Sequence, residues 1–304
     1  MYRRVGIAVF RLIARFSEVS LTGPHCALNC HHCRGKYLRH MLKPLPGSNG
    51  LYRLLEQLRQ KGVRGVLLSG GLTREGLLPI TENVVEQIWV AKRRLGMVFN
   101  LHPGFERRLD LLEQLVGAVD TLDYEFSLSR EIVKGVRRLP IKPRDTAKIL
   151  ETLLEIGFDV VPHIFLWHPW GSSQLLREEL RVADELGARM VTLLVYIPPP
   201  GDPKPDPARL VELLRLARSW WPRELSLGCM RPYDVKRVLD RAAIEEGLVD
   251  RIANPHQEVL RSYLDSVRAY DACCSLPEHV LGEFRIEPSQ LLAPPRSLVR
   301  ITLV

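Results

Sequence analysis

The feature that most constrains the fold is a repeated alternation of short β-rich runs with segments of helical periodicity. Most of the runs are separated by a helix-like segment such as 51–62 or 147–157. Several of these segments end in Lys or Gly, as helix C-termini do. Strands that alternate with helices pair in parallel through right-handed crossovers. The β-rich runs are residues 17–23, 64–71, 97–102, 123–129, 159–167, 190–198, 224–229 and 248–255.

Eight strand–helix units are what a (β/α)8 barrel requires, and a chain of 304 residues can accommodate one. The competing fold is an open, doubly wound sheet, which in its dinucleotide-binding form carries GxGxxG after the first strand. No such motif follows residues 17–23. We therefore predict an α/β fold, a full or nearly full TIM-type barrel over residues 17–278. We expect residues 1–16 to form a helical extension and residues 279–304 to form a C-terminal tail.

The first 16 residues combine basic side chains with an apolar run, as a signal peptide does. Arg11 and Arg15 interrupt that run, and no small-residue cleavage site follows it. We interpret the segment as an amphipathic helix. No apolar stretch reaches membrane-spanning length, so we expect a cytoplasmic protein with no membrane partner.

The chain carries a net charge of +8. A solvated, Arg-rich surface explains this charge, and attraction to an acidic partner is the alternative. A nucleic-acid-binding surface would be better supported by a basic run interleaved with aromatic residues. The basic runs 91–96 and 134–144 contain no aromatic residue, so we expect no nucleic-acid partner.

Three of the six cysteines lie within eight positions, directly after the first predicted strand. Cys26, Cys30 and Cys33 have the spacing C-x3-C-x2-C, and the functional groups of a barrel lie on the loops that follow its strands. Six cysteines are too few for a disulfide scaffold here, so clustered cysteines indicate ligands or catalysts. Three thiolates on a [4Fe–4S] cluster leave one iron open for a substrate or cosubstrate. The alternative is a zinc site completed by a neighbouring histidine, one of His25, His31 and His32.

This cysteine spacing on the first loop resembles the signature of the radical SAM superfamily. The resemblance implies that Cys26, Cys30 and Cys33 hold a [4Fe–4S] cluster. It also implies that S-adenosylmethionine chelates the fourth iron through its amino and carboxylate groups. The residue before the last cysteine is usually aromatic in this superfamily. Here it is His32, whose planar ring can provide the same packing surface.

The segment "LLSGGL" at the end of the second predicted strand resembles the Gly-Gly-Glu motif of the superfamily. The backbone of that motif receives the methionine amino group, so we expect Ser69, Gly70 and Gly71 to bind S-adenosylmethionine. Glycine suits this role because it allows close backbone approach. The third position is Leu72, so the role of the glutamate cannot be transferred.

Further contacts with S-adenosylmethionine are expected on the fourth and sixth strands. The resemblance implies a ribose contact on the fourth strand, where Glu125 fits best, and adenine contacts at Ile197 and Pro198. The alternative for Glu125 is an interior carboxylate paired with an arginine. Strand-end histidines are commonly packing residues, so we assign no role to four further polar side chains at strand ends: Asn100, His102, His163 and His168.

The other three cysteines lie far from the first set in the sequence. Cys229 sits in "LGCMRP", and the tandem pair Cys273 and Cys274 sits in "YDACCSL". Free cysteines can be buried packing residues, but a tandem pair is more than packing requires. We predict an auxiliary [4Fe–4S] cluster on these three cysteines, with Ser275 or a partner's residue as the fourth ligand, and all six cysteines at the C-terminal face of the barrel. A redox or structural thiol set is the alternative.

Longer stretches resemble a branch of the superfamily close to biotin synthase and lipoyl synthase. "SLTGPHCALNCHHCRGKYLRHM", "LLSGGLTREGLLPI", "VVPHI" and "LGCMRP…ANP…YDACCS" together are similar to one subunit of the two-component lipoyl synthases. This resemblance covers residues 17–278. It implies sulfur insertion into an unactivated C–H bond of a protein-bound octanoyl chain, with the auxiliary cluster as sulfur donor.

The same resemblance implies three partners. They are a second radical SAM subunit, an acidic lipoyl-carrier protein and an electron donor such as ferredoxin. The net charge of +8 suits an acidic carrier. Two alternatives stay open: a radical SAM enzyme of another class, such as methylation, rearrangement, tRNA thiolation or biotin synthase-like chemistry, and a zinc-bound structural or nucleic-acid-binding module.

Overall fold

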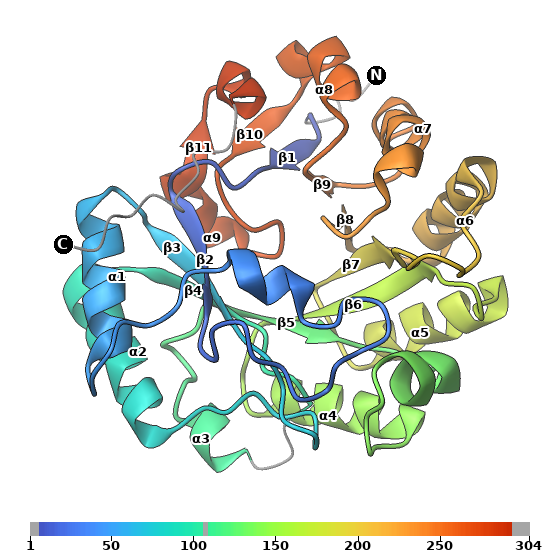
Figure 1. The fold of residues 1–304 in the computed structure, drawn as a ribbon. Coiled ribbons are helices and arrows are strands. Elements are labelled where there is room, and N and C mark those ends of the chain that lie inside the picture. The colour runs from blue at the N-terminus through green and yellow to red at the C-terminus, as the bar shows by residue number, and fades with distance from the viewer. Residues whose placement is uncertain (1–5, 106–108, 294–304) are drawn as a thin grey trace.

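The computed structural model describes residues 6–105 and 109–293. Its centre is one curled sheet, in which the strands from β2 to β9 lie side by side in chain order and are all parallel (Figure 1). These strands confirm the eight β-rich runs expected from the sequence. They are β2 (Phe16–Ser20), β3 (Gly65–Ser69), β4 (Val98–Leu101), β5 (Thr121–Glu125), β6 (Val160–Trp167), β7 (Met190–Val195), β8 (Glu224–Leu227) and β9 (Arg251–Ala253).

Helices connect the strands and cover the outer face of the sheet (Figure 1). In α1 the buried leucines recur at 51, 54, 55 and 58, the spacing of a helix with one apolar face. Side-chain oxygens of Thr81, Ser172 and Asp206 cap the N-termini of α2, α5 and α6. The helices are α1 (Gly50–Gln60), α2 (Glu82–Leu95), α3 (Asp110–Glu113), α4 (Pro143–Glu155), α5 (Ser173–Glu185), α6 (Pro207–Trp220), α7 (Tyr233–Glu245) and α8 (Gln257–Ser262).

The two ends of the chain complete the sheet beside β9. Strand β1 (Ala8–Phe10) lies between β9 and β10 (Arg268–Tyr270) and is parallel to both. The two-residue strand β11 (Arg285–Ile286) pairs antiparallel with β10. Within the described residues, β2 and β11 are the free edges of the sheet. The prediction of an α/β, nearly full TIM-type barrel is therefore confirmed.

The amphipathic helix expected for residues 1–16 is wrong where the structure describes that segment, which is from residue 6. Residues 8–10 form a strand in which each residue is at most 1% exposed. The run is apolar throughout because a parallel strand buried on both faces has no side that faces water. The arginines that resembled the polar face of a helix bind the C-terminal segment instead. Arg11 Nη1 donates to the carbonyl oxygens of residues 291 and 293, and Arg15 Nη1 donates to that of residue 283 at 2.9 Å.

The segment expected to be a tail is packed against the barrel as far as residue 293. It contains α9 (Glu278–Leu281) and three short elements, η4 (Gly282–Phe284), β11 and η5 (Pro288–Leu292). Leu281, Phe284 and Leu291 are buried in apolar clusters. The remainder of the expected tail, residues 294–304, and the first five residues lie outside the described part.

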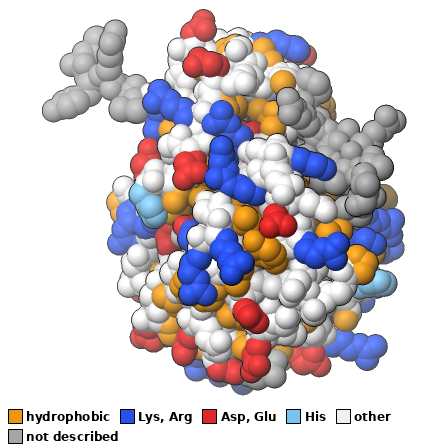
Figure 2. Space-filling view, turned by 90° about the vertical axis from the view of Figure 1, so that its left-hand side faces the viewer, with side chains coloured by type: hydrophobic (Ala, Val, Ile, Leu, Met, Phe, Trp, Pro, Cys, Tyr) orange, Lys and Arg blue, Asp and Glu red, His pale blue; other side chains and the backbone are white. Residues whose placement is uncertain are grey.

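The surface gives no sign of a single basic stripe on the side formed by α1 and α2. Figure 2 shows this side, where Lys and Arg side chains are interspersed with apolar and acidic ones. This mixed surface agrees with the interpretation of the net charge of +8 as a solvated, Arg-rich surface. No helix in the described ranges is long and apolar enough to cross a lipid bilayer.

Candidate functional site at the mouth of the barrel

The loop after β2 carries the first three cysteines across the open end of the barrel (Figure 1). Backbone contacts join this loop to the segment after β3. Ala27 N donates to Leu72 O at 2.9 Å, and Gly71 N donates to Thr22 Oγ1 at 2.6 Å. The Gly-Gly segment and the cysteine loop are therefore packed together as one unit.

Gly71 is the closest point between the two segments. A Cβ atom at this position would lie 1.8 Å from the His25 carbonyl oxygen and 2.5 Å from Cys26 Cα. Both neighbours are backbone atoms, which cannot rotate away. Glycine is thus required at position 71 because the cysteine loop packs directly on it.

We expect Gly71→Ala to displace the cysteine loop and to destabilise the protein by about 1–3 kcal/mol, the range for inserting an atom into a packed region. Gly135→Ala is a matched control, because a Cβ there meets nothing within 4 Å. Iron content after reconstitution and the midpoint of chemical denaturation measure the two effects. Equal values for the two variants would contradict the packing argument.

The turn from Cys30 to Cys33 rests on the π-helix η2 (Glu131–Val136) that follows β5. His31 N donates to Val136 O at 2.9 Å, and Cys30 Sγ lies 3.8 Å from Arg137 O. Within the turn, Arg34 N donates to Cys30 O at 2.9 Å. Backbone groups therefore hold the loop on both of its sides, at Leu72 and at Val136.

The Cys30 and Cys33 thiols are close enough to form a hydrogen bond with each other. That hydrogen bond lowers the pKa of Cys33 and raises the pKa of Cys30. A thiol with a lowered pKa loses its proton more readily and so binds a metal more readily. Cys26 and Cys33 are half-buried and Cys30 is buried. This set of three neighbouring thiols fits a three-cysteine [4Fe–4S] cluster.

Asp202 connects the cysteine loop to the segment after β7. Its carboxylate oxygens contact His31 Nε2 at 3.2 Å and accept a hydrogen bond from the Tyr196 hydroxyl at 2.9 Å. The His32 ring is buried with its centroid 6.1 Å from that of Tyr196, so it does act as a packing surface. Ile197 and Pro198 directly follow Tyr196 and are half-buried.

Glu125 forms an ion pair with the buried Arg137, which is the alternative that the sequence left open for it. Burial raises the pKa of Glu125, but Arg137 outweighs that effect and the net pKa is lowered. The carboxylate is therefore ionised at neutral pH. It keeps 36% of its side chain exposed, so the ion pair leaves room for a second contact.

Cys229 lies at the same mouth as the first cysteine set. It follows β8, and its thiol has a pKa raised to about 11, chiefly by burial and then by Cys274. The residue keeps solvent-exposed surface, although many protein atoms surround its thiol. Tyr37 lies near both cysteine sets. Burial is the largest cause that raises the pKa of its hydroxyl, and Cys33 and Cys229 raise that pKa further.

The tandem pair lies deeper in the barrel than expected. Cys273 Sγ accepts a hydrogen bond from Asn100 Nδ2 at 3.2 Å and lies 3.7 Å from Asp123 Oδ2. The Cys274 thiol lies close enough to Ser226, in the middle of β8, for this hydroxyl to lower its pKa. The expectation that all six cysteines lie at the C-terminal face is therefore wrong for this pair, which lies inside the bore.

Two arginines hold the tandem pair at this depth. Arg251, the first residue of β9, donates to the carbonyl oxygens of Cys274 at 3.0 Å and of Leu276 at 2.5 Å. Arg189 Nη2 donates to Ser275 O at 2.6 Å. Ser275 is fully buried, and its side chain is close enough to Asp123 to lower the pKa of that carboxyl.

Three residues of the site were not identified from the sequence: Arg137, Asp202 and Tyr37. Asp202 lies in "PPPGDP", which reads only as a turn. Arg137 lies in a basic run with the character of a solvated surface, and its contact with the cysteine loop depends on the fold. Tyr37 follows Cys33 by four residues, which is the one signal that the sequence could have offered.

No protein-family model matches the chain, and no curated protein matches it either.

Solved structures, in contrast, share its fold. Methylornithine synthase superimposes with a TM-score of 0.55 at 15% identity, over 83% of this chain and 73% of that one. Streptococcus suis SuiB bound to S-adenosylmethionine gives 0.51 at 16% identity, over 66% and 47%. The Methanocaldococcus infernus Elp3 gives 0.50 at 14% identity, over 79% and 65%. The chain thus spans about half the length of SuiB, and these likenesses show that it has the same curled α/β barrel fold as the three proteins.

Proposed function

We propose that the protein is a radical SAM enzyme in which Cys26, Cys30 and Cys33 hold a [4Fe–4S] cluster. The observation that carries this proposal is the three-thiol loop packed on Gly71 at the mouth of the barrel. SuiB, a protein of the same fold, has been solved with S-adenosylmethionine bound, which supports the choice of cosubstrate. When bound, the cluster supplies the electron that cleaves S-adenosylmethionine to a 5′-deoxyadenosyl radical.

The chain's own residues would bind and orient the cosubstrate. The backbone of Ser69, Gly70 and Gly71 receives the methionine amino group, and Glu125 contacts the ribose. The adenine binds along Ile197 and Pro198. These two residues follow Tyr196, whose contact with Asp202 keeps their segment beside the cysteine loop.

We further propose that the reaction is sulfur insertion into an octanoyl chain, as in a lipoyl synthase subunit. Cys229, Cys273 and Cys274 would hold an auxiliary [4Fe–4S] cluster, with Ser275 as the fourth ligand. The thiols of Cys273 and Cys274 share a hydrogen bond, and the charge of Cys274 raises the pKa of Cys229. The 5′-deoxyadenosyl radical would remove a hydrogen atom from the octanoyl chain. The auxiliary cluster, when bound, would supply the sulfur of the new C–S bond and take up the remaining electron.

The proposed reaction needs three partners. A second radical SAM subunit would complete the enzyme, and ferredoxin or a similar protein would supply electrons. The octanoyl chain would arrive on an acidic lipoyl-carrier protein, for which a net charge of +8 is suitable.

Iron and sulfide analysis of the anaerobically reconstituted protein tests the sulfur-donor proposal. Two clusters give about eight irons per chain, and replacing Cys229, Cys273 and Cys274 by alanine should leave about four. That variant should still release 5′-deoxyadenosine but should add no sulfur to an octanoyl-lysine peptide, as read by mass spectrometry. A wild-type protein that never exceeds about four irons would refute the sulfur-donor role.

A further inference from the structure

We propose that the bore of the barrel contains a separate metal site, in which His102, Asp123 and His163 bind one divalent first-row transition metal ion. Imidazole nitrogens and a carboxylate suit Fe²⁺ or Zn²⁺. The site does not rest on the proposed function, because none of its ligands belongs to either cysteine set.

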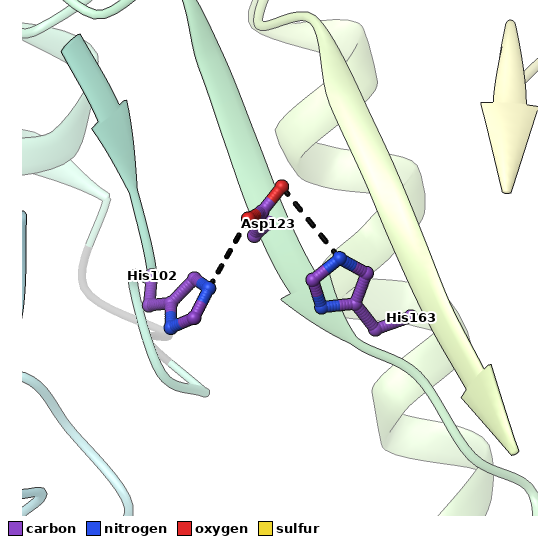
Figure 3. A group of neighbouring side chains, drawn as sticks. All are labelled: His102, Asp123 and His163. Carbon is purple, nitrogen blue, oxygen red and sulfur yellow. Dashed lines mark hydrogen bonds and ion pairs between the residues drawn. The ribbon is translucent and has the colours of Figure 1, made fainter. Parts of the chain in front are cut away.

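The three side chains come from neighbouring parallel strands and converge in the bore. His102 directly follows β4, Asp123 lies in β5 and His163 lies in β6. Their donor atoms all lie within 4.8 Å of one another. Figure 3 shows the carboxylate between the two imidazole rings, with one ring facing each of its oxygens.

Two of the three separations between donor atoms are close to those of a metal site, and the third is within 4.8 Å. Zinc binds nitrogen and oxygen at about 2.0–2.2 Å, so tetrahedral ligands lie about 3.3–3.6 Å apart. Here His102 Nε2 lies 3.2 Å from Asp123 Oδ2, and His163 Nε2 lies 3.7 Å from Asp123 Oδ1. Little movement is needed to place an ion among the three side chains.

Two of these donor atoms have no adequate partner without an ion. Within the described residues, neither Asp123 Oδ1 nor His163 Nε2 makes a hydrogen bond of acceptable geometry. Ser275 is close enough to affect the pKa of Asp123 but does not meet that geometry. Asp123 is 3% exposed, and unsatisfied polar atoms at that depth are costly. A cation between the two atoms would satisfy both.

The surrounding residues support the ligands as in known metal sites. Ser69 Oγ lies 3.3 Å from Nδ1 of His102, the ring nitrogen that would not bind the metal. Asn100 Nδ2 donates to Asp123 Oδ2 at 2.8 Å and leaves Oδ1 available. Metal-binding histidines and carboxylates usually have such outer contacts, which fix the orientation of the ligand.

The protonation states of Asp123 and His163 also suit metal binding at neutral pH. Burial opposes ionisation of Asp123, but the two histidines outweigh it and lower the pKa of the carboxyl. Burial lowers the pKa of His163 and so keeps its nitrogen lone pair available. Asp123 and Glu125 raise the pKa of His102 against the effect of burial, so a proton competes with the metal there. Glu18 and Arg137 also face the group.

Three protein ligands leave a coordination position open, as in catalytic rather than structural metal sites. Cys273 is near, at 3.7 Å from Asp123 Oδ2, but it is not one of the three converging ligands. The open position would therefore take water or an oxygen atom, such as a carboxylate or carbonyl oxygen, of a molecule bound in the bore.

Cobalt binding tests the site separately from iron–sulfur chemistry. The probe is Co²⁺, titrated anaerobically into the Cys26/Cys30/Cys33→Ala variant prepared without iron or sulfide. We expect one equivalent to bind with visible ligand-field bands. Adding His163→Asn or Asp123→Asn should weaken binding at least about tenfold, since even outer contacts of a metal site contribute that much.

His168→Gln is the matched control, because this histidine directly follows β6, has a buried nitrogen with no partner among the described residues, and is not one of the three ligands. It should bind Co²⁺ as tightly as its parent. Circular dichroism establishes that each variant is folded, and His102→Asn replaces any variant that is not. Absence of a bound equivalent, or equal affinity in the ligand variants and in His168→Gln, would refute the site. A thiolate charge-transfer band in a spectrum that His163→Asn leaves unchanged would assign the cobalt to the other cysteines and also refute it.

Discussion

Replacing Cys26, Cys30 and Cys33 together by alanine should abolish reductive cleavage of S-adenosylmethionine and remove about four irons per chain. The reason is that these thiols are the proposed protein ligands of the cluster that delivers the electron. The fold should survive, because the loop is held by backbone contacts with Leu72 and Val136 rather than by the thiols. The measurement is 5′-deoxyadenosine formed after anaerobic reconstitution with S-adenosylmethionine and dithionite.

Cys229→Ala is the control for this experiment. It removes a thiol from the same mouth of the barrel but not from the C-x3-C-x2-C loop, so cleavage of S-adenosylmethionine should persist. Undiminished 5′-deoxyadenosine from the triple variant would mean that the radical SAM proposal is wrong. A triple variant that keeps its iron but loses activity would place the cluster elsewhere.

The largest expected effect on stability comes from Arg251. Its guanidinium is 2% exposed, forms a two-pronged ion pair with Glu224, and donates to two carbonyl oxygens of the tandem-cysteine segment. Arg251→Met would leave both carbonyl groups without their donor and, among the described residues, would leave Glu224 with only its longer contact to Arg189 Nη1, at 3.5 Å. A buried acceptor that loses its donor costs about 1–3 kcal/mol, so for two acceptors we expect a loss of about 2–5 kcal/mol in the free energy of unfolding.

Chemical denaturation followed by circular dichroism measures this loss. Arg209→Met is the control, since Arg209 forms an exposed pair with Glu212, and such pairs contribute about 0–1 kcal/mol. The two variants should therefore differ by several kcal/mol. If they unfold at the same denaturant concentration, Arg251 does not anchor the segment.

The order of the strands and helices could be predicted from the sequence because each element has its own local pattern of apolar residues. The run 190–198 is apolar and rich in β-branched residues, and the run 64–71 has the apolar centre 66–68 followed by Gly70 and Gly71. Their counterparts β7 and β3 form as expected. The first 16 residues misled for a physical reason. A strand buried on both faces has no alternation, so an apolar run followed by Arg11 and Arg15 has the pattern of an amphipathic helix.

The candidate site, too, could be predicted from the sequence only in part. The thiols of the first set lie on one loop, so their spacing alone indicated a shared role. The depth of Cys273 and Cys274 could not be predicted, because it is set by Arg189 and Arg251, which are distant in the sequence. The group of two histidines and Asp123 comes from three strands, and each member alone has the pattern of a packing residue.

The position of β1 between β9 and β10 has a consequence for how the protein is made. Because translation proceeds from the N-terminus, β1 has no partner strand until residues 251–253 of β9 have been synthesised, on the order of tens of seconds later at about 5–20 residues per second. The β2–β3 pair, with the first cysteine loop, is complete long before that. The segment with Cys273 and Cys274 can settle into the bore only when β10 joins β1. Biogenesis thus separates the two thiol sets in time. The outer loop could receive the iron that we propose for it on a nascent chain, while the inner pair must wait for closure of the sheet.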